Sequence, residues 1–197
     1  MARPKYEDGQ KHAQKRLEEA FWKLLADYPL EKITINLLSK EANVNHNMIY
    51  YYYGNVLEMA ETIINSEVDF RFTNSFLDAF LLADTTGFKE IINSSTYQTH
   101  WQHLRIIFQN SSLLLHKLIT NKVKSDWLEH LHLDASSLSD EQDIEFNFII
   151  AGLMSLFRSD YSDDKILREN FFKSPIADGI RKTIQSWKET VSRCQVP

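Results

Sequence analysis

The sequence predicts an all-α fold, with a small N-terminal three-helix unit followed by a larger helical domain. Turn-forming residues are scarce, because 197 residues contain five glycines and four prolines. Hydrophobic residues (43%) and charged residues (25%) occur in the proportions of an ordinary globular protein. In segment after segment, the apolar residues recur at helical spacing, and this pattern is the main argument for the fold class.

The first helix is expected from Lys11 to Asp27, after a flexible arm at residues 1–10. Pro29 ends it, because proline disfavours helical geometry in the preceding residue. The arm and its continuation are basic, with five Lys/Arg against two Asp/Glu in the first 16 residues. One amphipathic stripe is formed by Leu17, Ala20, Phe21, Leu24 and Leu25.

A short second helix follows, for which Thr34 is the expected N-cap. Leu38 and Ala42 share one face of this helix at i, i+4 spacing. Asn43 follows, and asparagine tolerates the left-handed conformation that ends helices. The spacing therefore predicts a helix that ends at Ala42 and is followed by a tight turn.

A third helix is expected over about residues 46–53, capped by Asn45, with Ile49 and Tyr53 facing inward. Gly54 and Asn55 form the next turn and cap, and a long helix starts at residue 56. Two short helices joined by about three residues form the helix-turn-helix layout. The predicted domains are therefore residues 1–55 and residues 56–197.

The larger domain is expected to contain further helices. A break at residues 84–87 precedes helical patterns at 94–109 and 113–130, and a polar break at 133–140 precedes an apolar helix at 141–161. Ser174 and Pro175 start the last helix. Its predicted apolar side contains Ile176, Ile180, Ile184 and Trp187.

Residues 33–53 resemble the DNA-binding domain of TetR-family transcriptional regulators, and the likeness extends over roughly residues 14–60. That family typically reads Ile-Thr-Val, then Ala-Gly-Val-Ser, then an aliphatic residue followed by Tyr, any residue, Tyr or His, and Phe. The matching segments here are Ile33-Thr34-Ile35, Ala42-Asn43-Val44-Asn45 and Ile49-Tyr50-Tyr51-Tyr52-Tyr53. The chain departs from the family at Asn43, Asn45 and Asn47, and at Val56, where the family usually has a phosphate-binding Lys.

The resemblance implies a double-stranded DNA operator as partner. The second helix of a helix-turn-helix lies in the major groove with its first side chains at base edges, here His46, Asn47 and Met48. Tyrosine hydroxyls and helix N-termini are suited to phosphates, although Tyr50 and Tyr53 have the alternative of packing beneath the helix. The implied DNA-binding residues are Thr34, Asn45, His46, Asn47, Met48, Tyr50, Tyr51, Tyr52 and Asn55.

A second, softer resemblance lies at residues 148–157, which are similar to the penultimate helix of TetR-like proteins. In that family this helix and the last one form a four-helix dimer interface, so the resemblance implies a homodimer and a pseudo-palindromic operator. The alternative is an ordinary core helix of a monomer. The expected interface residues are Phe148, Gly152, Ser155, Leu156, Ile180, Ile184 and Trp187.

TetR-like proteins usually bind a small-molecule effector in the larger domain, and its identity is unknown here. Pockets of this kind are mostly apolar with a few polar groups. For each aromatic residue, filling the core is the alternative role. The candidate ligand-binding residues are Phe80, His100, Trp101, His103, Phe108 and Trp127. No metal site is predicted, because no acidic residue completes a ligand set beside the histidines.

Several function classes are disfavoured. The sequence has no GxSxG, no Gly-rich phosphate loop and no dinucleotide fingerprint, so no enzyme and no cofactor are predicted. Cys194 is the single cysteine, which suits a reducing compartment. The start lacks a signal-peptide pattern, and the longest apolar run, residues 146–157, is too short to span a bilayer.

The interpretation that combines these observations is a cytoplasmic, homodimeric transcriptional repressor that a small-molecule effector releases from DNA. The alternative is a helical protein-interaction or ligand-binding module in which DNA binding has decayed. Residues 1–65 contain eight Lys/Arg and nine Asp/Glu, and this neutrality, with Val56, favours the alternative. The polar tip at His46 and Asn47 and the basic arm favour the regulator.

Overall fold

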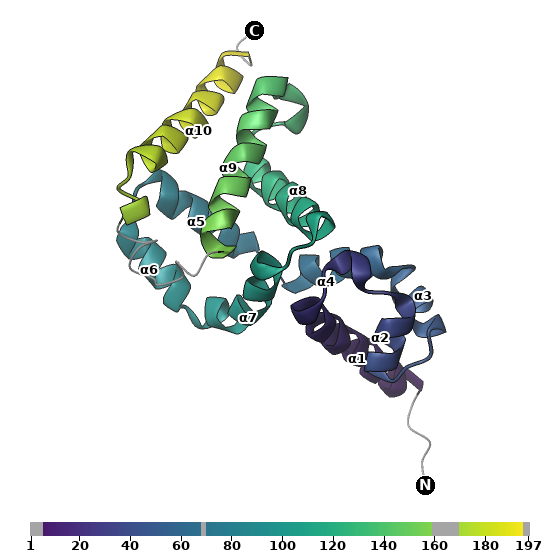
Figure 1. Cartoon of the computed structure of the whole chain (residues 1–197). Coiled ribbons are helices and arrows are strands. Elements are labelled where there is room, and N and C mark those ends of the chain that lie inside the picture. Colours follow the sequence, from purple (N-terminus) through teal and green to yellow (C-terminus); the bar gives the residue numbers. More distant parts are fainter. Residues whose placement is uncertain (1–5, 68–69, 159–169, 195–197) are drawn as a thin grey trace. The chain divides into compact units, whose positions relative to one another are not determined.

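The computed structural model describes residues 6–67, 70–158 and 170–194 (Figure 1). Every regular element in these ranges is helical, which confirms the predicted fold class. The chain divides into two compact units. Unit 1 comprises Met1–Val68 and Asn110–Leu118, and unit 2 comprises Asp69–Gln109 and Ile119–Pro197. None of the described helices combines the length and apolar character needed to cross a bilayer.

Unit 1 contains α1 (Tyr6–Asp27), a 3₁₀ turn η1 (Leu30–Lys32), α2 (Ile35–Ala42), α3 (Asn47–Tyr53) and α4 (Val56–Glu67). The sequence suggested a division at residues 55/56, but α4 belongs to the same compact unit as α1–α3. In Figure 1 these helices appear in purple and blue shades. Helix α1 packs against both α2 and α3, and α3 packs against α4.

Helix α1 begins at Tyr6, five residues before the expected start at Lys11. Residues 6–10 are therefore helical, and the prediction that they belong to a flexible arm is wrong. The basic residues Arg3 and Lys5 lie outside the described residues.

The core of unit 1 follows the predicted amphipathic stripe of α1. The side chains that are fully buried there are Leu17, Phe21, Leu25, Leu38, Ile49, Met59 and Ile63. The two ends of α2 also lie where the sequence predicted them. The Thr34 hydroxyl accepts the Leu37 amide at 3.2 Å, and Asn43 adopts the left-handed conformation with φ 50°. Local caps thus define both ends of α2.

Unit 2 contains α5 (Phe70–Leu81), α6 (Thr85–Asn93), α7 (Ser95–Gln109), a second 3₁₀ turn η2 (Ala135–Ser137), α9 (Asp140–Arg158) and α10 (Pro175–Cys194). Helix α8 (Leu113–His130) has the predicted bounds, and its residues from Ile119 onward belong to unit 2. The expected break at residues 84–87 is shorter than predicted. Asp84 caps α6 by accepting the Thr86 and Gly87 amides, so residues 85–87 form a helical turn.

Two aromatic clusters fill unit 2. The first contains Phe76, Phe80, Phe88, Phe171 and Phe172, with neighbouring ring centroids 5.0–6.3 Å apart. Buried Arg181 lies over the Phe80 ring, donates to the Phe80 and Phe172 carbonyls, and pairs with Asp178. Each of these contacts compensates part of the cost of burying the guanidinium. The second cluster contains Trp127, Phe146 and Trp187.

Candidate nucleic-acid interface

Helix α3 has one buried face and one exposed face. Ile49 and Tyr53 are buried, as the i, i+4 spacing predicted. Asn47 is exposed, and Tyr50 and Tyr51 are 56% and 70% exposed. Tyr50 and Tyr51 follow Asn47 by three and four positions, so both lie next to Asn47 on the same side of the helix. The second helix of the pair thus presents an amide and two phenols to solvent.

The start of α3 is fixed by Asn45. Its Oδ1 accepts the Asn47 amide at 2.9 Å, and its carbonyl accepts the Met48 amide at 2.9 Å. His46 precedes the helix with helical backbone angles and no side-chain cap bond. Asn45 and His46 are exposed, whereas Met48 is half-buried. The N-cap position expected for Asn45 is occupied by His46, while the Asn45 side chain binds the first amide of the helix from one residue earlier. Three exposed polar residues thus occupy the tip of the helix.

The consecutive tyrosines divide between surface and core. The Tyr51 and Tyr52 rings meet edge to face at 5.0 Å, and the Tyr52 and Tyr53 rings are 6.1 Å apart. Tyr52 is half-buried and Tyr53 is buried. The prediction that packing explains Tyr53 is confirmed. Tyr50 and Tyr51 are the tyrosines of this run that remain largely exposed.

The residues expected at phosphates near the helix N-termini differ in their surroundings. Thr34 is exposed at the start of α2. At the start of α4, Asn55 Oδ1 accepts the Glu58 amide at 3.0 Å, and Asn55 Nδ2 donates to Glu58 Oε1 at 2.6 Å. The Glu58 carboxylate also lies against Gly54, whose φ of 77° suits glycine. A negative charge therefore stands beside the expected phosphate position at Asn55.

Few cations lie on the recognition elements. Helix α3 contains no Lys or Arg, and Lys23 on α1 is paired with Glu41 of α2. Arg16 Nη1 donates to the Asn43 carbonyl at 3.3 Å, which links α1 to the turn between α2 and α3. The surface is therefore polar and aromatic rather than strongly basic.

Sequence reasoning missed a polar contact beneath α3. The Tyr53 hydroxyl donates to Glu18 Oε1 at 2.9 Å, and Gln14 Nε2 donates to the same oxygen at 3.1 Å. Burial, and next the hydrogen bond to Glu18, raise the pKa of Tyr53 above its ordinary value. The sequence did offer one sign of this hydrogen bond. The resembled family pattern has phenylalanine where this chain has Tyr53, so the extra hydroxyl needs a partner when it is buried.

Unit 2 contains a small apolar cavity of about 50 Å³. Its lining residues are Thr73, Phe76, Phe108, Val123, Trp127, Ile150, Leu153 and Met154. Two predicted ligand residues, Phe108 and Trp127, line it, and Trp127 Nε1 donates to the Thr73 carbonyl at 3.2 Å.

Other candidate ligand residues lie elsewhere. Phe80 is fully buried in the phenylalanine cluster beneath Arg181 and is not among the lining residues of the cavity. His103 is half-buried and is not among the lining residues of the cavity. The side chains of His100 and Trp101 lie outside the described residues.

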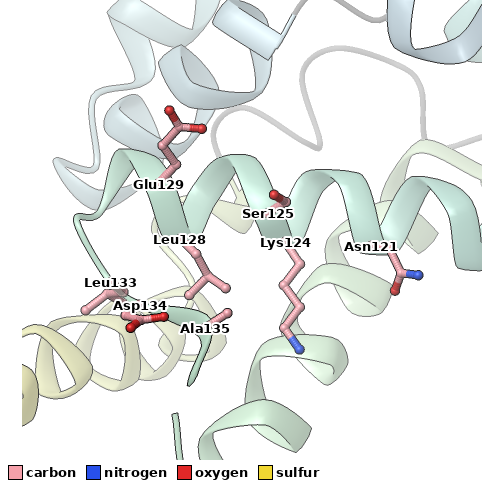
Figure 2. A pocket seen from close by; sticks show the side chains of 8 residues that line it. All are labelled: Asn121, Lys124, Ser125, Leu128, Glu129, Leu133, Asp134 and Ala135. Carbon is pink, nitrogen blue, oxygen red and sulfur yellow. The ribbon is translucent and has the colours of Figure 1, made fainter. Parts of the chain in front are cut away.

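A wider groove of about 390 Å³ lies along α8 and the segment after it (Figure 2). Its lining residues are Asn121, Lys124, Ser125, Leu128, Glu129, Leu133, Asp134 and Ala135. Lys124 is paired with Asp143 of α9, and Asp134 Oδ1 accepts the Ser136 amide at 2.9 Å. The Lys124–Asp143 pair joins α8 to the start of α9, and Asp134 stabilises the turn after α8. The polar residues of the groove therefore have a structural role.

The residues expected at a dimer interface are split between surface and core. Phe148 is 77% exposed, and Gly152 and Ser155 are exposed, with no atom within 4 Å of a Cβ placed on Gly152. Ile180 is half-buried, and the Leu156 side chain lies outside the described residues. Ser155 Oγ donates to the Gly152 carbonyl at 2.7 Å.

Ile184 and Trp187, which were expected at the contact with a second copy, are buried within their own chain. Trp187 stacks on Phe146 of α9 at 4.6 Å, and its Nε1 donates to Glu145 Oε2 at 2.9 Å. Within the stripe of α10, Trp187 is therefore covered by α9. Ile176, which the sequence placed on the same stripe, is exposed at the start of the helix.

No family model and no curated protein matches the chain. Among solved structures, the chain is similar to the TetR family repressor AlkX from Dietzia sp. strain DQ12-45-1b, which is implicated in biodegradation of n-alkanes. The two chains are 17% identical, the similarity covers 89% of this chain and 96% of that one, and the TM-score is 0.44. The function proposed for this chain therefore rests on its own residues.

Proposed function

We propose that the protein is a sequence-specific DNA-binding transcriptional regulator. The observation that carries the proposal is the exposed polar face of α3, which follows a capped α2 and a left-handed turn at Asn43. In a helix-turn-helix the second helix enters the major groove. Asn47 at its start has the donor and acceptor pair that matches adenine. The exposure of Tyr50 and Tyr51 supports a role for their hydroxyls in binding phosphates and setting the register.

The functional unit is proposed to be a homodimer that contacts through α9. Ile144 and Phe148 are 68% and 77% exposed and, with Gly152, follow one another at i, i+4 spacing. Large apolar side chains grouped on one exposed face mark an interaction site. Two-fold pairing of this face would place two copies of α3 on a pseudo-palindromic operator.

The dimer is tested with Phe148→Asp, which places a charge in the middle of the α9 face. We expect a monomer in analytical ultracentrifugation, with the unfolding free energy changed by about 0.5 kcal/mol or less, because Phe148 is exposed in the single chain. The matched control is Phe108→Leu in the cavity of unit 2, which should leave the oligomeric state unchanged. A Phe148→Asp variant that sediments like the wild type would contradict the α9 interface.

The effector site is proposed to be the cavity between α5, α7, α8 and α9, lined by Phe108 and Trp127. Its apolar lining suits an uncharged hydrophobic compound, and because its volume of about 50 Å³ is far below that of ordinary ligand pockets, the surrounding helices would have to move apart to admit one. Release from DNA would follow from a higher affinity of that compound for a conformation that does not bind the operator. The function would accordingly be repression relieved by the effector.

A second candidate function is supported by the charge on unit 1. The Glu58 carboxylate at the start of α4 and the lack of Lys or Arg on α3 both weaken attraction to phosphates. Under this alternative, the exposed face of α3 binds a protein or another ligand and DNA binding has been lost.

The proposed function is tested by selecting binding sites from a random duplex pool at about 50–100 mM salt. The full-length wild type is compared with an Asn47→Ala/Tyr51→Ala variant. The matched control is Tyr28→Ala/Asn93→Ala, which removes the same side-chain types at exposed positions outside α3. We expect a pseudo-palindromic site for the wild type and the control but not for the α3 variant. If the wild type enriches no sequence, the second candidate is favoured.

A further inference from the structure

The orientation of α3 depends on its contacts with the rest of unit 1. The helix has seven residues, whereas isolated helices shorter than about 12–15 residues are marginal in water. Its conformation is therefore maintained by packing within unit 1. Ile49 and Tyr53 are its buried side chains. Any loosening of these two contacts would move the exposed face that carries Asn47, Tyr50 and Tyr51.

Apolar burial selects which face of a helix is turned inward but sets its exact rotation only coarsely, because the hydrophobic effect is non-directional. A hydrogen bond is directional and adds that constraint. The bond from the Tyr53 hydroxyl to Glu18 Oε1, at 2.9 Å, joins the last turn of α3 to α1 across 35 positions of the sequence. Its acceptor is a carboxylate, and charge-assisted bonds are the stronger class. Gln14 donates to the same oxygen and so orients the carboxylate.

Helix α1 holds the other end of the recognition element as well. Arg16 Nη1 donates to the carbonyl of Asn43 in the turn that precedes α3. Arg16 and Glu18 thus connect one rigid helix to two points, one before α3 and one at its end. One point fixes the turn that leads into α3 and the other fixes the last turn of the helix, so together they restrict its direction. The bond to Tyr53 is the one that involves α3 itself.

We infer that Tyr53 and Glu18 are positioning residues for sequence recognition, and that their hydrogen bond sets the orientation in which α3 meets the bases. The inference rests on the proposed function. Tyr53 is buried beneath α3, and the Glu18 carboxylate would repel phosphates, so both act through the helix rather than by touching DNA. The resembled family pattern has phenylalanine at this position, so the hydroxyl is a feature of this chain.

The test compares Tyr53→Phe, which keeps the ring and removes the hydroxyl, with Glu18→Ala and Glu18→Gln. Affinity is measured for the selected operator duplex and for a scrambled duplex of the same composition. We expect Tyr53→Phe and Glu18→Ala each to weaken operator binding about tenfold. Affinity for the scrambled duplex should not change, and the double variant should be no weaker than either single one. Glu18→Gln keeps an acceptor oxygen and should retain most of the operator affinity.

A second readout does not use DNA. Amide hydrogen exchange of residues 47–53 should accelerate in full-length Tyr53→Phe, while the amides of α4 exchange as in the wild type. The control is Glu41→Gln, which removes the charge of the exposed α1–α2 ion pair and should leave α3 exchange unchanged. Unchanged α3 exchange, or an unchanged preference for the operator over the scrambled duplex, overturns the inference. If the wild type enriches no duplex at all, the proposed function fails and the recognition role fails with it.

Discussion

Helices α3 and α10 are both amphipathic, yet their faces have different uses. On α3 the apolar face is covered within unit 1, and the residues proposed to function lie on the opposite, polar face. On α10 the apolar face itself was expected to meet a second copy, but Ile184 and Trp187 are covered by the same chain. An apolar stripe shows that a face is covered, but it does not show what covers it. The exposed polar residues of a well-anchored helix are a more direct pointer to function.

The largest effect is expected from Trp187→Ala. Trp187 is 2% exposed, stacks on Phe146 and donates to Glu145, so the change leaves a large cavity and an unpaired carboxylate. The free energy of unfolding should fall by about 3–5 kcal/mol in urea titrations. Ile176→Ala, at an exposed position of the same helix, should change it by about 0.5 kcal/mol or less. A Trp187→Ala protein that keeps its stability and only loses self-association would restore the interface role.

The corresponding change on α3 is Ile49→Ala. Ile49 has no exposed surface, so its truncation should cost about 2–5 kcal/mol of unfolding free energy. Tyr51→Ala should cost about 0.5 kcal/mol or less, because the side chain is 70% exposed. In affinity for the selected operator the order should be reversed, with Tyr51→Ala losing more than Ile49→Ala. This affinity is measured at a temperature where both variants are folded. Equal destabilisation by the two changes would contradict the division of α3 into a packing face and a reading face.

The helix ends of unit 1 were predictable because they depend on near neighbours. The caps at Thr34, Asn45 and Asn55 each join residues two or three positions apart. The partner of Tyr53, in contrast, lies 35 positions away, and no local pattern selects Glu18 among the acidic residues of α1. The candidate interface could therefore be predicted, but not the contact that holds it.

The aromatic residues of unit 2 likewise have contacts that local sequence patterns do not predict. Phe80 and Phe108 are of one type and both lie on predicted helices, yet Phe80 fills an aromatic cluster and Phe108 lines a cavity. Their roles depend on which other helices approach them. Helical spacing gives the inward face of each helix but not the packing between helices.

A smaller effect is expected from Thr34→Ala at the start of α2. The Thr34 hydroxyl accepts the Leu37 amide, and loss of an N-cap of this kind costs about 1 kcal/mol. Ser39→Ala within the same helix should be close to neutral, because its hydroxyl bonds the carbonyl of Asn36 and caps no free amide. Thermal and urea unfolding of the two variants measure the difference. A neutral Thr34→Ala variant would show that packing alone determines where α2 begins.

The smallest effect, and the one that tests the anchor of α3 most directly, is a dependence of stability on alkaline pH. The pKa of Tyr53 is raised in the folded protein above the ordinary value of 10.0, by burial first and by Glu18 next. Below pH 10 both states hold the phenolic proton, so its contribution to stability is fully present. Above pH 10 the unfolded chain loses this proton while the folded chain keeps it, so stability falls as pH rises.

The measurement compares the unfolding free energy of the wild type with that of Tyr53→Phe between pH 9 and pH 11. The decline above pH 10 should be steeper for the wild type, because the variant has no phenol at this position to titrate. Tyr51→Phe is the matched control and should decline as the wild type does, since Tyr51 is largely exposed. Parallel curves for the wild type and Tyr53→Phe would mean that Tyr53 titrates alike in both states. The hydroxyl would then not hold α3 against α1, and the orientation of the reading face would depend on Ile49 and the capped turn alone.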